Sequence, residues 1–442
     1  MTGMARQASG SLADHEKDDR LLAIHEIVQA GLCIGCGLCQ SIAGSDKLAM
    51  VLTGEGRERP VARTQLEPAK LALINAVCPG LRLEGASSGS GSEDGEEDLV
   101  WGRARQLAIG YAADPEIRHR GSTGGVLTAL GQFLIASGRV KFILHVAASR
   151  ETPFRSERRL SFDAASVLEG AGSRYGPAAP LIDFASILDR GEPFALIAKP
   201  CDVSAVRNLA RHDSRVDRYM KYALALVCGG ASDLTKSTDL LAEMGIEEDE
   251  VTLFRYRGYG NPGPTRIETD KGRSVEFSYQ DMWEDEAKWR IQPRCKICPD
   301  AIGEAADLVA SDVWPGCSPT GDDQGFNGVI VRTESGSELY EAALAAGVIA
   351  IEPRTVGFRD FDLYQPHQVR KKRAVWARFL GMKAAGQPTP RTIGLRLEAC
   401  ARLNAVSANL AEARGARQRA RQGSLGEPRP FHGGPNDGSV GS

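Results

Sequence analysis

No run of apolar residues in this sequence approaches the length of a membrane-spanning helix, and the polar first twenty residues lack the hydrophobic core of a signal peptide. Neither sign of charge dominates. The formal net charge is -3 at pH 7, which excludes a wholesale attraction to nucleic acid or to a membrane surface. No internal repeat is present. These absences predict a cytoplasmic protein with no membrane partner.

What the sequence does contain is the composition of an ordinary globular protein, with 42% hydrophobic and 25% charged residues in 442. This length is sufficient for two or three domains. Shifts in composition predict the following segments: a disordered tail (1–20), a cysteine-bearing module (21–84), a flexible acidic linker (85–100), a large core (101–360), a basic helical region (361–420) and a Gly-, Pro- and Ser-rich disordered tail (421–442).

Short apolar runs alternate with helical patterns across the large core. The runs at 141–148, 194–200, 222–228 and 307–313 are almost continuously apolar, which is typical of strands covered on both faces. Between them, stretches such as GGVLTALGQFLIASG carry an apolar stripe at helical spacing. Strand followed by helix, repeated, indicates an α/β fold.

Three cysteines lie close together in GLCIGCGLCQ. Cys33, Cys36 and Cys39 form an overlapping Cys-x-x-Cys-x-x-Cys run, and Cys78 follows later, directly before a proline. Bacterial ferredoxins supply three thiolates of a 4Fe–4S cluster from such a run and another from a distant Cys-Pro. The intervening glycines allow the loop to wrap around a cluster. A zinc site is the alternative, but zinc typically takes two separated Cys-x-x-Cys pairs.

Four further cysteines are scattered through the core. Cys201 and Cys228 each follow a predicted buried strand, the position at which α/β sheets present ligands, while Cys295 and Cys298 form a Cys-x-x-Cys pair. The loops can therefore converge into a second set of four thiolates. Alternatively, the first two are small buried hydrophobic residues and the pair is a redox dithiol. The residues alone leave both interpretations open. The two remaining cysteines have no partner at a suitable spacing and are predicted to be structural.

The stretch RHRGSTGGVLTAL runs from a polar loop into a helix. Ser122, Thr123, Gly124 and Gly125 at the helix start can offer hydroxyl and backbone N–H donors to an anion such as a pyrophosphate or a flavin phosphate. A Ser or Thr before a helix is also an ordinary N-cap. The stretch is neither a Walker A loop nor a complete G-x-G-x-x-G fingerprint.

The cysteine run with its later CPG, followed by GSTGGVLTAL, KPCD, VCGG, RCKICPD and GVIVRTESG, resembles the beta subunit of the coenzyme F-420-reducing hydrogenase. This coenzyme F-420 hydrogenase/dehydrogenase beta subunit family includes 7-hydroxymethyl chlorophyll a reductase and the ferredoxin-dependent 8-vinyl reductase. The likeness covers about residues 25–360. It implies FAD near the glycine turn, Lys199 close to the flavin or a cluster, and a second 4Fe–4S cluster held by four residues, Cys201, Cys228, Cys295 and Cys298.

The fold expected on this basis is α/β, a mixed-sheet flavin-binding core with an N-terminal ferredoxin-like iron–sulfur module. Iron–sulfur clusters pass single electrons, whereas a flavin accepts electrons singly and releases a pair as hydride. A chain with both therefore converts one-electron transfer into two-electron chemistry. We therefore expect an oxidoreductase that carries electrons from ferredoxin, or a deazaflavin coenzyme, through two 4Fe–4S clusters and FAD to an unsaturated small-molecule substrate.

Substrate reduction needs a proton donor beside the flavin. His119, Tyr175 in GSRYGP and His145 are candidates, although each is also readily explained as a structural residue. Together with Lys199, which the resemblance places near the cofactors, His119 and Tyr175 form the predicted catalytic set.

Two other functions fit parts of the sequence. The chain is alternatively an electron-relay subunit, inactive alone, whose larger partner performs the chemistry. The basic stretches RKKR (370–373) and RGARQRARQ are a pattern that also occurs in proteins that contact nucleic acid. Solvated helix faces, or docking to an acidic ferredoxin, explain these charges more simply, so no nucleic-acid partner is expected.

Overall fold

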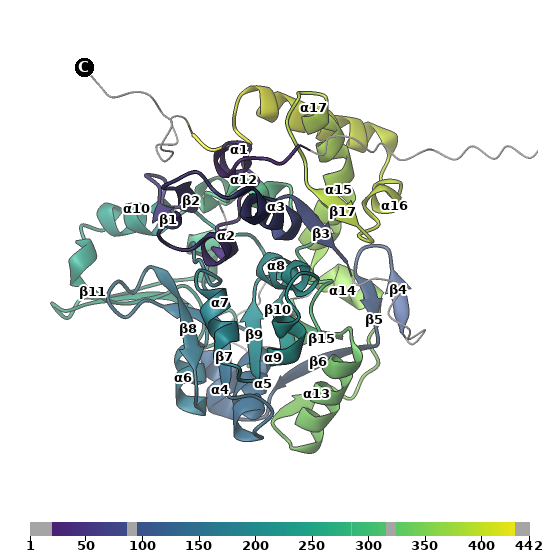
Figure 1. Cartoon of the computed structure of the whole chain (residues 1–442). Helices are drawn as coiled ribbons and strands as arrows, with labels where there is room; N and C mark the ends of the chain where they lie inside the picture. The colour runs from purple at the N-terminus through teal and green to yellow at the C-terminus, as the bar shows by residue number, and fades with distance from the viewer. Residues whose placement is uncertain (1–19, 86–94, 284, 315–323, 429–442) are drawn as a thin grey trace, which may run out of the picture.

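An eight-stranded mixed sheet forms the centre of the computed structural model, which describes residues 20–85, 95–283, 285–314 and 324–428 (Figure 1). Its strand order is β16-β6-β15-β14-β10-β9-β7-β8. In chain order these strands are β6 (Gln106–Ala112), β7 (Phe142–Ala148), β8 (Ser156–Ser161), β9 (Phe194–Ala198), β10 (Met220–Leu226), β14 (Leu308–Asp312), β15 (Asn327–Val331) and β16 (Ile349–Ile351). Strands β7, β9, β10 and β14 are parallel to one another, and the remaining pairings are antiparallel.

The four parallel strands coincide with the four apolar runs predicted from the sequence. Ala195, Leu196, Ala223 and Leu224 are completely buried on neighbouring strands. Their side chains alternate between the two faces of the sheet, and both faces are covered by helices. The α/β interpretation is therefore confirmed, and the sheet is mixed as expected.

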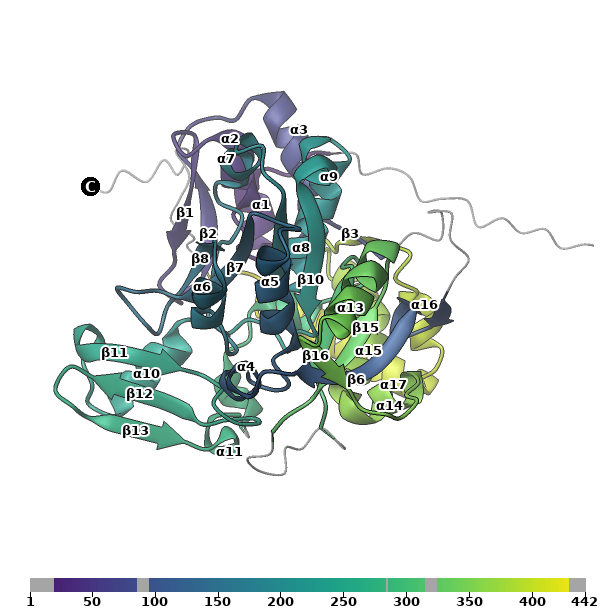
Figure 2. The same ribbon diagram turned by 90° about the horizontal axis from the view of Figure 1, so that it is seen from below.

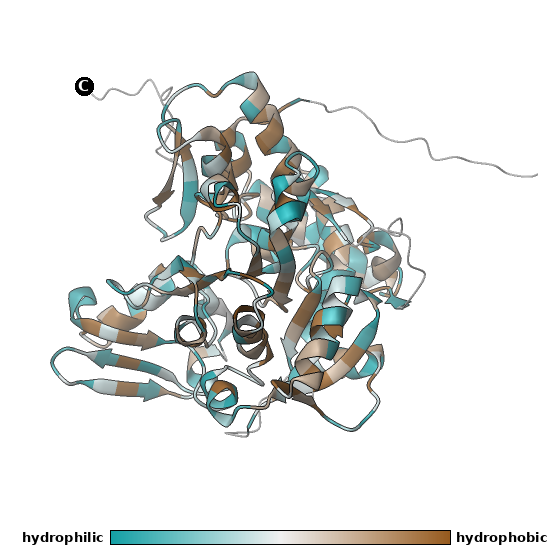
Figure 3. Ribbon diagram, turned by 60° about the horizontal axis from the view of Figure 1, so that its bottom comes forward, coloured by the Kyte–Doolittle hydropathy of each residue, from teal (hydrophilic) through white to brown (hydrophobic). Residues whose placement is uncertain are grey.

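Helices cover the two faces of the sheet as separate layers. One layer consists of α4 (Pro115–Arg120), α5 (Val126–Ala136), α6 (Ala164–Glu169) and α13 (Glu334–Ala345). The other consists of α7 (Phe184–Asp189), α8 (Pro200–Ala210), α9 (Arg215–Tyr219) and α14 (Phe358–Tyr364). Figure 3 shows apolar residues concentrated toward the middle of the molecule. Among the helices that the structure describes, none is both long and apolar enough to cross a membrane.

The carboxyl ends of the parallel strands bring distant parts of the chain to one edge of the sheet. Lys199 follows β9, Cys228 follows β10, and Asp312 ends β14. The glycine turn reaches the same edge, because the Ala112 amide donates to the Gly124 carbonyl at 2.7 Å. In open α/β sheets this edge is where ligands bind.

A three-stranded antiparallel sheet projects from one side of the molecule (Figure 2). It contains β11 (Val251–Arg255), β12 (Thr265–Thr269) and β13 (Ser274–Phe277), accompanied by α10 (Thr235–Glu243), α11 (Tyr279–Trp283) and the 3-10 helices Glu248–Glu250 and Glu286–Trp289. Phe254, Tyr256, Ile267 and Trp283 form its own small core. The short helix α12 (Pro293–Lys296) leads back to the central sheet.

The N-terminal segment packs against the main body. It comprises α1 (Ile24–Gln29), α2 (Leu38–Ala43), β1 (Leu48–Leu52), β2 (Glu58–Ala62), α3 (Pro68–Val77) and β3 (Arg82–Glu84). Leu38 and Val77 belong to the same core as Phe184 and Val203 of the sheet-covering helices. The Leu181 amide also donates to the Cys36 carbonyl at 2.9 Å. The sequence predicted a module on a tether, whereas the structure gives this segment a core in common with the α/β domain.

Parts of the predicted linker and C-terminal tail are ordered. In the linker, β4 (Glu96–Asp98) pairs with β5 (Gly102–Ala104) of the following core segment, and Val100 is buried; residues 86–94 lie outside the described residues. In the tail, Leu425 is buried in a core formed with α1 and α15, and the Glu427 carboxylate is buried as well. The polar composition concealed these few anchoring residues, so the expectation of disorder was wrong for them.

The basic C-terminal region is helical. It contains α15 (Pro366–Lys383), α16 (Leu397–Ala401), α17 (Val406–Arg421) and the short strand β17 (Arg391–Ile393) after α14. Its RKKR stretch (370–373) is not exposed to solvent along its whole length. Lys372 is only 4% exposed and its Nζ lies 2.6 Å from the Glu304 carboxylate and 2.9 Å from the Pro299 carbonyl. This charge therefore fixes α15 to the core.

We expect Glu427→Ala to destabilise the protein by about 3 kcal/mol, because it leaves buried arginine charge without its partner. The Glu427 carboxylate accepts from Arg57 Nη1 at 2.9 Å and from Arg59 Nε at 2.6 Å. Urea unfolding measures the change. The control is Glu398→Ala, which removes an exposed pair with Arg402 and should cost less than about 1 kcal/mol. Equal, small effects of the two substitutions would show that the C-terminal anchor contributes nothing.

Candidate functional site

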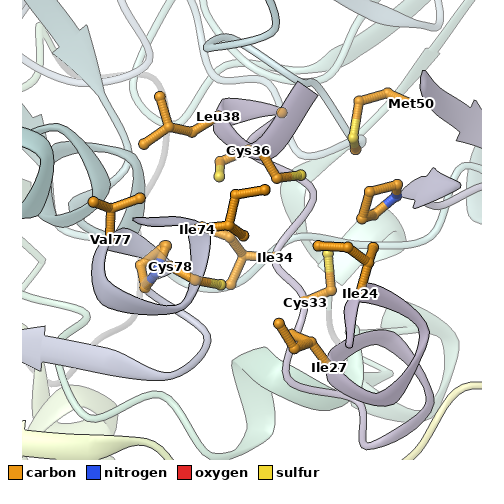
Figure 4. A pocket seen from close by; sticks show the side chains of 14 residues that line it. Ile24, Ile27, Cys33, Ile34, Cys36, Leu38, Met50, Ile74, Val77 and Cys78 are labelled. Carbon is orange, nitrogen blue, oxygen red and sulfur yellow. The ribbon is translucent and has the colours of Figure 1, made fainter. Parts of the chain in front are cut away.

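Four cysteines of the N-terminal segment line one cavity. Cys33 and Cys36 come from the loop between α1 and α2, Cys39 lies in α2, and Cys78 directly follows α3. The cavity is partly open to solvent, and its other walls are mainly aliphatic. Figure 4 shows the sulfur atoms of Cys33, Cys36 and Cys78 around the same space. The structure thus brings together the first predicted set of thiols.

Burial and mutual repulsion disfavour the ionised form of these thiols. Burial raises the pKa of all four, and the pKa values of Cys36 and Cys39 lie well above the ordinary range. Charge on Cys39 or Cys78 raises the pKa of Cys36 further, and Cys33 contributes to raising that of Cys78 to about 11. Four thiolates can exist together here only when a bound cation offsets their charge.

Two glycines shape the loop around this cavity. Gly35 and Gly37 have left-handed φ angles of 73° and 85°, a conformation in which other residues are strained. A Cβ atom on Gly37 would lie 2.5 Å from Ile182 Cγ2. The Gly35 amide donates to the Cys33 sulfur at 3.4 Å. The loop therefore wraps around the space between the thiols, as the sequence predicted.

The other four predicted ligands also come together. Cys201 lies in the first turn of α8 and Cys228 follows β10, while Cys295 lies in α12 and Cys298 just after it. Charge on Cys228 and on Cys298 raises the pKa of Cys201, and Cys295 and Cys298 contribute to raising that of Cys228 to about 12; burial is the largest cause in both. The strand ends and the Cys-x-x-Cys pair converge, which the sequence had left open.

Cations from three elements surround this second group. Lys371 of α15 lowers the pKa of Cys228 and of Cys298, opposing the larger effect of burial. Arg294 has the same effect on Cys298. On the opposite side, Lys199 Nζ lies 3.1 Å from the buried Asp202 carboxylate and lowers the pKa of Cys201. Negative charge in this space is therefore partly compensated by the protein.

The thiols surround a volume and do not meet at one point. Within residues 20–85, 95–283, 285–314 and 324–428, no group of three or more His, Cys, Asp or Glu side chains is arranged to hold a metal ion. A zinc ion requires four ligands at about 2.0–2.3 Å from a single centre. A cuboidal cluster has a volume of its own and takes its ligands at the corners. The first group lines a cavity.

The structure describes one of the two cysteines that the sequence predicts to be structural. Cys400 is fully buried and its thiol donates to the Leu99 carbonyl at 2.8 Å, which agrees with a structural role. Cys317 lies outside the described residues.

The glycine turn is held by contacts within the protein. Ser122 Oγ accepts from the Ser173 amide at 2.6 Å, and Thr123 Oγ1 accepts from Asn327 Nδ2 at 2.6 Å. Each hydroxyl keeps its hydrogen for a further partner. Gly124 abuts backbone, since a Cβ there would lie 2.7 Å from Asn327 N. Close packing thus accounts for this glycine, whether or not the turn binds a cofactor.

Gly125 is the left-handed N-cap of α5, with a φ angle of 74°. A Cβ at this position would lie 2.8 Å from the Ile117 carbonyl. Backbone geometry thus requires glycine here too.

The predicted catalytic residues lie in three different environments. Tyr175 is joined to the glycine turn by the buried Arg257, which donates to the Tyr175 hydroxyl at 3.0 Å and to the Ser122 carbonyl at 2.9 Å. Lys199 lies beside the second cysteine group. His119 is exposed at the end of α4, and its ring packs edge-on against Tyr259.

His145, a further candidate proton donor, has a structural environment. It is 7% exposed, and its Nε2 lies 2.7 Å from Ser161 Oγ on the neighbouring strand β8. Burial, with the positive charge of Arg159, lowers its pKa to about 4. The imidazole is therefore neutral near pH 7.

Sequence reasoning missed the charged residues next to the cysteines. Asp202 directly follows Cys201, and Arg294 directly precedes Cys295, so proximity in sequence to predicted ligands was an available signal. Arg257 and its partner Asp312, 3.1 Å apart, are far from each other in the sequence, and no local pattern indicated that they pair.

Two family models match consecutive parts of this chain. Both describe the beta subunit of the coenzyme F420 hydrogenase/dehydrogenase: the model of its N-terminal part matches residues 108–185, and the model of its C terminus matches residues 191–356. The chain belongs to this family. The matched regions include the glycine turn and the second cysteine group, whereas the first group precedes them.

Relatives of known name are distant in sequence. The coenzyme F420 hydrogenase subunit beta of Methanothermobacter thermautotrophicus is 21% identical over 302 residues, covering 66% of this chain and 100% of that protein. The coenzyme F420-dependent sulfite reductase of Methanocaldococcus jannaschii is 24% identical over 335 residues, covering 72% of this chain and 47% of that protein. This chain thus spans about half the length of the sulfite reductase.

A similar solved structure is a chain of the F420-reducing NiFe hydrogenase complex from Methanosarcina barkeri. It is 19% identical and has a TM-score of 0.47, and the match covers 63% of this chain and 95% of that one.

We expect Gly124→Ala to lower the free energy of unfolding by about 1–3 kcal/mol, because the new Cβ meets backbone atoms that cannot move aside. Thermal and urea unfolding check this. Gly54→Ala is the control, since a Cβ at Gly54 has no atom within 4 Å. A stable Gly124→Ala variant would contradict the packing explanation.

We expect His145 to make the protein acid-sensitive. Its folded-state pKa of about 4 lies below the unfolded value, so the unfolded state binds the proton more readily as the pH falls below about 6.5. This linkage removes about 2 kcal/mol of stability between pH 7 and pH 5. Urea unfolding of His145→Gln should show a smaller acid loss than the wild type, and His25→Gln, at an exposed position, the full loss. Identical pH profiles for all three proteins would refute this assignment.

Proposed function

We propose that this chain is an electron-transferring subunit of a larger oxidoreductase, with one 4Fe–4S cluster in each cysteine group. The observation that carries the proposal is the distribution of the cysteines: every described one except Cys400 belongs to one of two groups of four, whose members are half-buried or buried. Disulfides do not explain the arrangement, since all nine described cysteines are free. Each group offers the four thiolates that a cuboidal cluster takes.

The residues around the first group suit a cluster. The cavity walls beside the cysteines are mainly aliphatic, and the Gly35 amide of the loop donates to the Cys33 sulfur at 3.4 Å. Arg59 lies near Cys33 and lowers the pKa of that thiol, opposing burial. Solvent exclusion, hydrogen bonds to sulfur and nearby charge are the means by which a protein adjusts cluster potentials.

The relay is favoured over a self-sufficient, ferredoxin-dependent reductase. The matched hydrogenase and formate dehydrogenase proteins are named as subunits, and the sulfite reductase extends well beyond the matched part. A partner that performs the substrate chemistry accounts for these names and lengths, and coenzyme F420 or a related deazaflavin is the two-electron partner that the relatives' names indicate.

A flavin at the carboxyl edge of the sheet completes this proposal. FAD would exchange single electrons with the second group and a hydride with the soluble coenzyme. Ser122 and Thr123 retain hydroxyl hydrogens for a phosphate, and Lys199 supplies positive charge at the same edge. Gly124 and Gly125 do not add support, because packing explains them.

We expect anaerobically purified protein to contain about eight iron atoms and an equal amount of sulfide per chain. Cys36→Ser and Cys298→Ser should each lose about half of the iron, since each removes one ligand of a different cluster. Cys400→Ser is the control and should keep all of it. Iron, sulfide and zinc analysis provides the measurement. Zinc without sulfide would overturn the clusters, and about four irons would remove one of them.

Flavin and partner content are measured on the same preparation. FAD released on denaturation would support the flavin, and its absence would leave a cluster relay alone. Co-purification with a larger oxidoreductase chain supports the subunit role, whereas substrate reduction by the isolated chain with reduced ferredoxin would contradict it.

A further inference from the structure

The two cysteine groups share a buried arginine. Arg294 is 2% exposed and precedes Cys295 at the start of α12. Its Nη2 donates to the Pro79 carbonyl at 3.1 Å, next to Cys78 of the first group. Its Nη1 donates to the Ile297 carbonyl at 3.3 Å, next to Cys298 of the second group. The guanidinium thus contacts the backbone beside one ligand of each group.

The charge of Arg294 acts on both groups as well. It lowers the pKa of Cys78 and that of Cys298, opposing the larger effect of burial. The other cations near the thiols act on one group each: Arg59 on the first, Lys199 and Lys371 on the second. Arg294 differs from these cations because it acts on thiols of both groups.

No carboxylate among the described residues pairs with Arg294, and its Nε has no hydrogen-bond partner. A buried, uncompensated charge costs several kcal/mol, so proteins retain one only when a counter-charge is present. Asp202, which acts on thiols of both groups, is already paired with Lys199 at 3.1 Å. The missing counter-charge must therefore come from the thiolates themselves.

We propose that Arg294 is a positioning residue for electron transfer, the shared counter-charge of the two clusters, which holds the two sites adjacent and raises both of their reduction potentials. This inference rests on the proposed function. Transfer between the groups moves one electron, which the flavin proposed above exchanges with the second group, and breaks no bond. A fixed positive charge between the sites stabilises the added electron on either side, because reduction makes a cluster more negative.

The experiment is a potentiometric titration of both clusters by electron paramagnetic resonance, using the full chain loaded with iron and sulfide. Arg294→Gln removes the charge and keeps an N–H donor, Arg294→Met removes both, and Arg294→Lys keeps the charge. We expect both potentials to become more negative in the Gln and Met variants and to stay near the wild-type values in the Lys variant. Loss of both clusters from a folded Gln variant, with the Lys variant loaded, supports the proposal equally.

Arg332→Met is the matched control. Arg332 is 4% exposed, donates to the carbonyls of Trp101, Arg103 and Ile302, and has an Nε without a partner, yet it lies near Glu304 and not among the cysteines. Its loss should reduce stability and leave both potentials unchanged. A shift in one cluster only, an equal shift with Arg332→Met, or equal effects of Gln, Met and Lys would overturn the proposal. A wild-type protein without iron would instead overturn the proposed function itself.

Discussion

Eight thiols gathered into two neighbouring groups are the feature on which the rest of this molecule depends. Burial and the charge of neighbouring thiols raise the pKa of Cys36 and of Cys201, so the ionised form of these thiols needs positive charge close by. The protein supplies part of it as Arg59, Lys199, Lys371 and the shared Arg294. These cations come from segments far apart in sequence, which ties the folding of distant elements to the assembly of one interior.

Residues from both ends of the chain contribute to the charge compensation in this interior. The buried Glu427 accepts from Arg57, directly before β2, and from Arg59 on β2. Arg57 also forms a two-point contact with Asp233, at 2.7 Å, on the main body. Arg59 in turn lies beside Cys33. The ordered part of the C-terminal tail thus lies close to the N-terminal thiol site. A core and charge compensation shared with the α/β domain would hold the proposed first cluster in a fixed geometry, which a tether would not.

The second group follows from the topology of the sheet. Parallel strands β9 and β10 end at one edge, and the helix α8 between them starts immediately after its strand, at Pro200. Cys201 and Cys228 are therefore neighbours for the reason that makes this edge a ligand site in other α/β proteins. Arg257 holds the glycine turn and Tyr175 at the same edge, together with Asp312. In the proposed arrangement, this edge of the sheet would carry the clusters, the flavin and the soluble coenzyme one after another.

The sequence by itself determined the buried strands, the helix after the glycine turn and the first set of cysteines. Each of these signals is local: an apolar run, a helical stripe, a Cys-x-x-Cys spacing. It could not decide whether Cys201 and Cys228 meet the Cys295 pair, because that depends on strand order. It also misjudged the tail, since two anchoring residues, Leu425 and Glu427, outweigh a polar composition only when their distant partners are in place. Only the tertiary structure revealed Arg294 between the groups. Its proposed role depends on its hydrogen bonds to two backbone segments and on thiols that are far apart in the sequence.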